Sequence, residues 1–284
     1  MTDDQEQHDR TAIYGQTLVK IVFIALATLP MSGYLSEDDK RVRATGPSAE
    51  DTVNQTAQQL ERDVKKALRG RDFRWVEISI EGSKATLGGQ VLDFLAKDQA
   101  VRQALDVDGI ETVVSELKLP ERESDNEIAQ DIDKAIQRYA YYTIWDHITG
   151  RVNDGKVSLE GRVTPDRNKV DELFERVAKV KGVQDIQNNI LTLPQSHSDE
   201  KVRRSIARRF SSNIHFERFV SMVNPPFHIV VQNGVITLVG YVQTQFELIE
   251  MRRIVGLTPG VLRVENRLRT LQGPIKARKT ATEA

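Results

Sequence analysis

Five histidines and one short polar run are the residues of this chain that could support catalysis or bind a metal. The histidines are His8, His147, His197, His215 and His228. None has a second histidine four residues away with a nearby carboxylate, the arrangement by which a helix presents zinc ligands. The run from Ser196 to Asp199 (SHSD) contains the residue types of a hydrolase triad, but triads are assembled from distant segments, so we interpret this run as a linker and a helix start. We therefore expect no catalytic residue, no metal, no cofactor and no enzymatic activity.

Composition excludes several other classes of protein. The 284 residues include no cysteine, which removes disulfides, thiol nucleophiles and iron–sulfur clusters. No phosphate-binding loop or dinucleotide fingerprint is present. Forty basic side chains stand against 41 acidic ones, a net charge of -1, which excludes a polycation wrapped on nucleic acid. We expect no nucleic-acid partner.

The charge is unevenly distributed along the chain. Residues 1–51, 52–120 and 121–194 carry net charges of -4, -1 and -3, whereas residues 195–284 contain 14 basic and 7 acidic side chains, a net charge of +7. The sequence therefore predicts a basic module at the C-terminus.

The N-terminal part contains a continuous apolar run, Ile21 to Leu29. It is much shorter than the roughly 20 residues of a membrane span, and its length suits the roughly 7 to 15 apolar residues of an export signal. We interpret residues 18–36 as a signal or membrane anchor, after an acidic leader (1–17) and before a linker (37–47). The alternative is a buried core helix, which the lack of a polar face disfavours; cleavage and the natural start residue stay open.

A unit of about 70 residues recurs three times. Each copy contains a strand that carries a glycine, followed 20 or 21 residues later by a second glycine that precedes an alternating strand. The first set is Gly89, Gly161 and Gly240, and the second set is Gly109, Gly182 and Gly260. We interpret these glycines as structural, allowing a strand to bend or another backbone to approach closely.

Each unit also has helix and hairpin signals. Ser124 and Glu127 have the spacing of a capping box, and Ser48 and Ser198 predict the other helix starts. Asp154-Gly155 and Asn233-Gly234 predict tight hairpins. The second helices are expected at 93–105, 165–180 and 244–255. The predicted fold is α+β: three αββαβ modules (48–120, 124–194 and 198–272), with helices on one face of a small sheet, and a basic flexible tail (273–284).

These units resemble the BON domain, named for osmotically induced periplasmic and nodulation proteins. The resemblance rests on the strands Leu87-Gly-Gly89-Gln-Val91, Leu159-Glu-Gly161-Arg-Val163 and Leu238-Val-Gly240-Tyr-Val242, each followed by the second glycine. It implies a periplasmic protein, anchored to the inner membrane by the N-terminal segment, that binds phospholipid or envelope proteins without catalysis and supports envelope integrity or a stress response. The family motif is structural and supplies no ligand residues.

Two groups of side chains are candidates for lipid or partner binding. The third unit is longer than the second before its glycine, and the extra residues are apolar and aromatic, next to several arginines. Cationic side chains near anionic lipid are worth about 1 kcal/mol each, and inserted aromatic side chains add to this. The candidates in the third unit are Arg203, Arg204, Arg208, Arg209, Phe216 and Phe219, and those in the second unit are Tyr142 and Trp145.

Other interpretations remain beside lipid binding. The same side chains could contact a protein partner or fill the core, and the chain could be a ring or scaffold component of an envelope assembly, so homo-oligomerisation stays open. RNA binding by the third unit as a KH-like module is disfavoured, because the G-x-x-G loop is missing.

Overall fold

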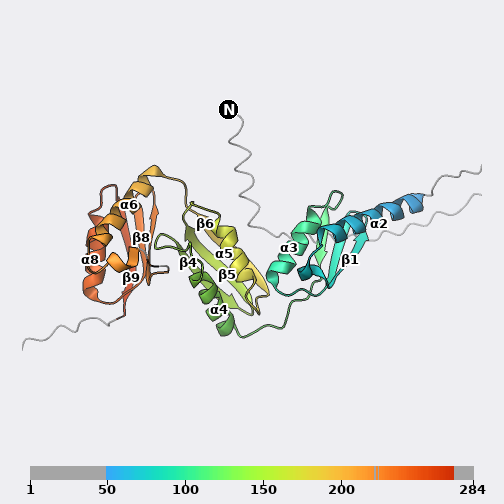
Figure 1. Ribbon diagram of the computed structural model, residues 1–284, viewed down its shortest axis with the longest axis horizontal. Helices are drawn as coiled ribbons and strands as arrows, with labels where there is room; N and C mark the ends of the chain where they lie inside the picture. Colours follow the sequence, from blue (N-terminus) through green and yellow to red (C-terminus); the bar gives the residue numbers. More distant parts are fainter. Residues whose placement is uncertain (1–48, 221, 223, 272–284) are drawn as a thin grey trace, which may run out of the picture. The chain divides into compact units, whose positions relative to one another are not determined.

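A computed structural model describes residues 49–220, 222 and 224–271, which form two compact units (Figure 1). The first unit holds most of the N-terminal module, and the second holds the middle and C-terminal modules; each unit is described by itself. The predicted leader, anchor segment, linker and tail lie outside the described residues, as does the predicted cap Ser48. No helix among the described residues combines the length and the apolar character that crossing a bilayer requires.

Module 1 has a three-stranded sheet in the order β1-β2-β3. Strands β2 and β3 are parallel, so helix α3 serves as the crossover between them. Buried apolar side chains on both helices and on β2, such as Val64, Leu87 and Ala100, form its core. Its elements are α2 (Ala49–Ala67), η2 (Arg71–Phe73), β1 (Val76–Glu81), β2 (Lys84–Gly89), α3 (Phe94–Leu105) and β3 (Thr112–Ser115).

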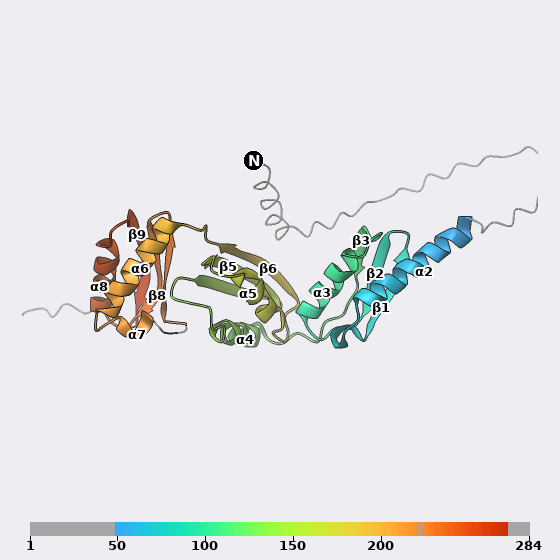
Figure 2. The ribbon, with the colours of Figure 1, turned by 45° about the horizontal axis from the view of Figure 1, so that its top comes forward.

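Module 2 repeats this topology with longer strands. Strand β5 pairs antiparallel with β4 and parallel with β6. Helices α4 and α5 lie against this sheet (Figure 2). The core between them includes Ile128, Leu173 and Leu159, all three with no exposed surface. The elements are α4 (Asp125–Gln137), β4 (His147–Asn153), β5 (Lys156–Val163), α5 (Lys169–Ala178) and β6 (Asp185–Thr192).

Module 3 has the same sheet order and one extra helix. Strand β8 pairs antiparallel with β7 and parallel with β9, while α6 and α8 supply Ile206 and Met251 to the core. The extra helix, α7, is formed by the insertion that lengthens this unit. The elements are α6 (His197–Ser211), α7 (Glu217–Val220), β7 (Phe227–Gln232), β8 (Val235–Val242), α8 (Gln245–Gly256) and β9 (Arg263–Thr270).

The predicted α+β class and the three αββαβ units are confirmed. The capping box of Ser124 and Glu127 is present with both of its hydrogen bonds. The predicted cap Ser198 is wrong: Ser196, in extended conformation, accepts the hydrogen bond from the Asp199 amide, and Ser198 lies in the first turn of α6. Helix α5 begins at Lys169, four residues later than predicted.

The first helix of modules 2 and 3 is tied to the hairpin turn by one carboxylate. Asp125 accepts hydrogen bonds from the amides of Asp154 and Gly155, both at 2.9 Å. Asp199 accepts equivalent bonds from the amides of Asn233 and Gly234, at 2.8 and 2.9 Å. These bonds lower the pKa of Asp125, because they stabilise its charged form. An aspartate at the equivalent position of each module, Asp125 or Asp199, thus joins the first helix to the hairpin turn.

The repeated strand glycines allow close backbone contact at two positions. A Cβ atom on Gly161 would lie 2.1 Å from the carbonyl oxygen of His147, and one on Gly240 would lie 2.4 Å from that of Pro226. Both distances are far below van der Waals contact, so no side chain fits where β5 and β8 pair with the preceding strands. All six motif glycines have positive φ angles: these two and also Gly89, Gly109, Gly182 and Gly260.

Candidate functional site

The predicted arginines of module 3 lie on α6, but only three of the four reach solvent. Arg204, Arg208 and Arg209 are exposed. Arg203 is 5% exposed and donates hydrogen bonds to the carbonyl of Val231, at 3.1 Å, and to Glu200, at 3.3 Å. Arg203 therefore belongs to the packing of α6 against β7, which corrects its prediction as a surface contact.

The predicted insertion residues Phe216 and Phe219 are buried, with exposed fractions of 0% and 7%. The Phe216 ring stacks on Phe210 with ring centroids 4.9 Å apart, and Phe219 meets Phe227 edge to face, also at 4.9 Å. The insertion thus extends the core of module 3. Phe216 and Phe219 are therefore not part of the lipid-binding surface that the sequence had predicted. Apolar side chains gain more by packing inside the module than by facing water.

Module 3 exposes several large apolar side chains, and one group of them lies on α8 and in the turn after α6. Phe246 and Ile249 are 57% and 59% exposed, one helical turn apart, and Ile214 after α6 is 81% exposed. Phe246 and Ile249 stand opposite the buried side of α8, which carries Met251 and Val255. These side chains were not among the predicted site residues, although the three-residue spacing of Phe246 and Ile249, on the side opposite the buried stripe, was a readable signal.

The segment that follows α6 lies beside α8. Asn213 at the end of α6 donates a hydrogen bond to Glu250 of α8 at 3.3 Å, and the ring of His215 meets that of Phe246 with centroids 5.0 Å apart. The exposed Arg209 lies one turn before Asn213, and the exposed Arg252 lies one turn after Ile249. We group the exposed residues on and next to these two helices as the helix face; it comprises Arg209, Ile214, Phe246, Ile249 and Arg252.

Module 3 also receives part of its core from module 2. The amide of Ile229 on β7 donates a hydrogen bond of 2.6 Å to the carbonyl of Ile144, which precedes β4. The Ile144 side chain is 4% exposed and belongs to the core cluster of module 3. Strand β7 is the edge of its sheet, so this segment covers backbone groups that would otherwise be unpaired.

The predicted aromatic pair of module 2 lies at this junction. Tyr142 is 3% exposed, and its hydroxyl accepts a hydrogen bond from the amide of Ile148. Trp145 is half-buried and packs against the core of module 3. Because Tyr142 is buried, it is not part of the predicted binding surface. Trp145 contacts module 3 of the same chain.

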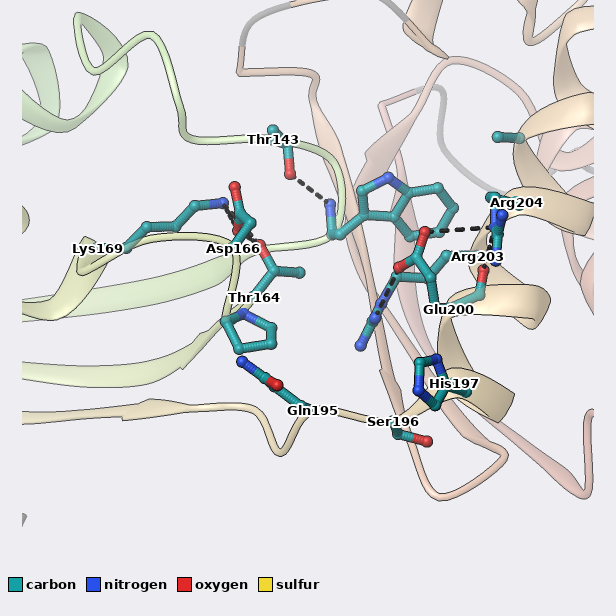
Figure 3. A pocket seen from close by; sticks show the side chains of 13 residues that line it. Thr143, Thr164, Asp166, Lys169, Gln195, Ser196, His197, Glu200, Arg203 and Arg204 are labelled. Atoms are coloured by element: carbon teal, nitrogen blue, oxygen red, sulfur yellow. Dashed lines mark hydrogen bonds and ion pairs between the residues drawn. The ribbon is translucent and has the colours of Figure 1, made fainter. Parts of the chain in front are cut away.

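A cavity of about 600 Å³ opens beside the junction. Figure 3 shows Lys169, Asp166 and Thr164 of module 2 on one side and Glu200 and Arg203 of α6 on the other.

The charged groups of the cavity are largely paired with one another. The ammonium group of Lys169 has no exposed surface and lies 2.9 Å from a carboxylate oxygen of Asp146 and 3.0 Å from one of Asp166. Asp146 also accepts hydrogen bonds from the amides of Thr143 and Thr164. This network fixes the loop before α5 and the segment that enters module 3. Within the described part of the chain, no cluster of three or more His, Asp or Glu side chains could hold a metal ion.

The architecture defines a class of protein: tandem small α+β domains in which two helices cover one face of a three-stranded sheet. The family model of the BON domain matches residues 53–121, 124–194 and 198–272, which is more than half of the chain. The chain therefore belongs to the BON domain family and contains three tandem BON domains.

Similarity to solved structures is weak. CdsD, a structural protein of the type III secretion system of Chlamydia trachomatis, is 13% identical with a TM-score of 0.21, over 75% of this chain and 92% of its own. The periplasmic domain of PrgH is 11% identical with a TM-score of 0.17, over 75% of this chain and all of its own. TM-scores this low support no argument about arrangement or function. No curated protein matches the chain.

Proposed function

We propose that this chain is a non-catalytic protein of the periplasm whose third BON domain binds anionic phospholipid surfaces through the helix face. The single observation that carries the proposal is the exposure of Phe246, Ile249 and Ile214 beside the exposed Arg209 and Arg252. Apolar side chains that enter the interface gain by leaving water, and the arginines interact with anionic headgroups.

The charge of module 3 supports this assignment. Residues 195–271 contain 11 basic and 6 acidic side chains, a net charge of +5. Two of the acidic side chains, Asp199 and Glu247, are buried, whereas Arg203 is the only buried basic one among these residues. The surface of this module is therefore more cationic than its composition indicates, and we expect it to attract an anionic membrane.

The membership of the family supports a binding role in the envelope rather than catalysis. We propose periplasmic localisation with residues 18–36 as the inner-membrane anchor, and a role in envelope integrity. A ring or scaffold component of an envelope assembly is the competing function that the following experiment distinguishes.

Vesicle flotation tests the proposal directly. A fragment of residues 121–284 omits the apolar segment 18–36, which could bind lipid by itself, and retains Ile144, which completes module 3. We expect the fragment to bind vesicles that contain phosphatidylglycerol and to bind vesicles of phosphatidylcholine alone only weakly. Binding should weaken as salt rises, because exposed charges are screened within about 10 Å at 0.1 M salt. Equal binding to both vesicles, or none to either, contradicts the proposal; discrete large oligomers would support the scaffold function.

A further inference from the structure

The junction of modules 2 and 3 contains one histidine from each module: His228 is buried and His147 is half-buried. His147 begins β4 and His228 lies in β7, with ring centroids 5.7 Å apart. His228 is 8% exposed, and its Nδ1 atom faces the carbonyl of Thr143 at 3.3 Å. The Nδ1 atom of His147 is buried and has no hydrogen-bond partner among the described residues. The ring of Tyr142 lies 5.1 Å from that of His228.

Among the described residues, few charged groups surround the pair, and none of them forms an ion pair with it. Asp133 of α4 lines the same groove as both histidines, and accepts a hydrogen bond from Gln137. Arg162 of β5 is opposite His147 in the strand register.

Two further charged groups act on the pair. Arg267 of β9 acts on His147 as a positive charge. Asp146 favours a charged His228, but its carboxylate already contacts Lys169 and the Thr143 and Thr164 amides.

Burial favours the neutral form of both imidazoles. It lowers the pKa of His228 to about 4, with the neighbouring His147 as the next cause. It also lowers the pKa of His147, with Arg267 adding to the effect. A charge placed in this junction would lose its hydration without gaining a dedicated carboxylate partner.

We propose that the junction of modules 2 and 3 is a proton-controlled latch, closed while His147 and His228 are neutral and released when the pair takes up a proton. The segment that carries Ile144 and Trp145 lies directly before His147, and Ile229, which binds the Ile144 carbonyl, lies directly after His228. Release would therefore separate the residues that hold the junction.

The direction of the effect follows from linkage. In the released state the histidines have an ordinary pKa of about 6.5, above the values of the docked state. A lowered pKa in the docked state gives docking its full stability above about pH 6.5, and this stability is lost as the pH falls towards 4. For His228 alone, the ratio of docked to released molecules falls about thirtyfold between pH 7.5 and pH 5. Most carboxylates stay ionised over this range.

The tryptophans provide a reporter in the full chain. It contains two, Trp75 of module 1 and Trp145 at the junction, so W75F leaves Trp145 as the single reporter. We expect the emission of Trp145 to shift to longer wavelength, and its quenching by acrylamide to increase, between pH 7.5 and pH 5, while the far-ultraviolet circular dichroism stays constant. No change in either fluorescence property would overturn the proposal.

Variants identify the groups that take up the proton. His147→Gln with His228→Gln, in the W75F chain, should remove the pH response, whereas His215→Gln should retain it, because His215 contacts Phe246 away from the junction. An equal response in both variants would overturn the proposal.

Hydrogen exchange provides a measurement without mutation. In the full chain, the protection factor of the Ile229 amide, corrected for its intrinsic exchange rate, should be at least tenfold lower at pH 5 than at pH 7.5. The protection factors of the amides that join β8 and β9 should stay unchanged. Unchanged protection at Ile229 would count against the latch even if the histidine variants failed to fold.

Discussion

The amide of Ile229 donates its hydrogen bond to the carbonyl of Ile144, 85 residues earlier in the chain, and the Ile144 side chain lies in the core of module 3. A short segment of one BON domain therefore completes the edge strand and the core of the next. Recognition through main-chain bonds at a sheet edge, with an apolar side chain in a pocket, is the chemistry of strand addition. Here it joins two domains of the same chain.

Ile144→Ala should destabilise module 3, although the residue belongs to module 2. Removing a fully buried branched side chain costs about 2–5 kcal/mol, and we expect a loss within that range. Chemical denaturation, followed by hydrogen exchange in β7 and β8, measures it. Leu191→Ala is the control, because Leu191 on β6 is 57% exposed and its loss should change stability by less than about 0.5 kcal/mol. Equal effects would show that Ile144 does not support module 3.

Gly161→Ala should destabilise module 2 by about 1–3 kcal/mol. The new Cβ would meet the backbone of β4 at 2.1 Å, so the strands must separate to accept it. Gly150→Ala is the matched control on the partner strand, where the Cβ would lie 3.5 Å from a Leu159 methyl group in ordinary contact. Urea denaturation of both variants compares them, and a Gly161 variant as stable as the control would refute the close-approach explanation.

Lys169→Met should cost about 3–5 kcal/mol, because it leaves the buried carboxylate of Asp146 without its cation. Lys181→Met is the control: it removes a surface ion pair with Glu123. The Lys181 side chain is 72% exposed, so this change should cost no more than about 1 kcal/mol. Thermal unfolding of the two variants gives the comparison. Similar losses would indicate that the Asp146 carboxylate is held adequately by the Thr143 and Thr164 amides.

The parts of this fold that local chemistry determines were predictable from the sequence. Asp154-Gly155 and Asn233-Gly234 form the expected tight turns, since positive φ angles at both central positions suit these residues. The capping box at Ser124 was equally readable, because its partners are three residues apart.

The parts that depend on tertiary packing were not predictable in this way. The insertion of module 3 is apolar whether it faces lipid or the core, and only the arrangement of α6 and β7 decides that Phe216 is buried. The contact of Ile144 with Ile229 likewise joins segments far apart in the sequence, with no local signal. The exposure of Phe246 depends on which side of α8 packs against the sheet, and that side carries Met251 and Val255.

Vesicle binding by variants of the helix face tests the central claim most directly. In the fragment of residues 121–284, Phe246→Ser with Ile249→Ser should lower the salt-resistant binding to phosphatidylglycerol vesicles at least tenfold, because both side chains are more than half exposed and available to insert. Leu191→Ser, at a similarly exposed position on β6 of module 2, should leave binding unchanged. Binding that is unaffected by the α8 variant, or lowered equally by the Leu191 variant, would contradict the assignment of the helix face as the lipid-binding surface.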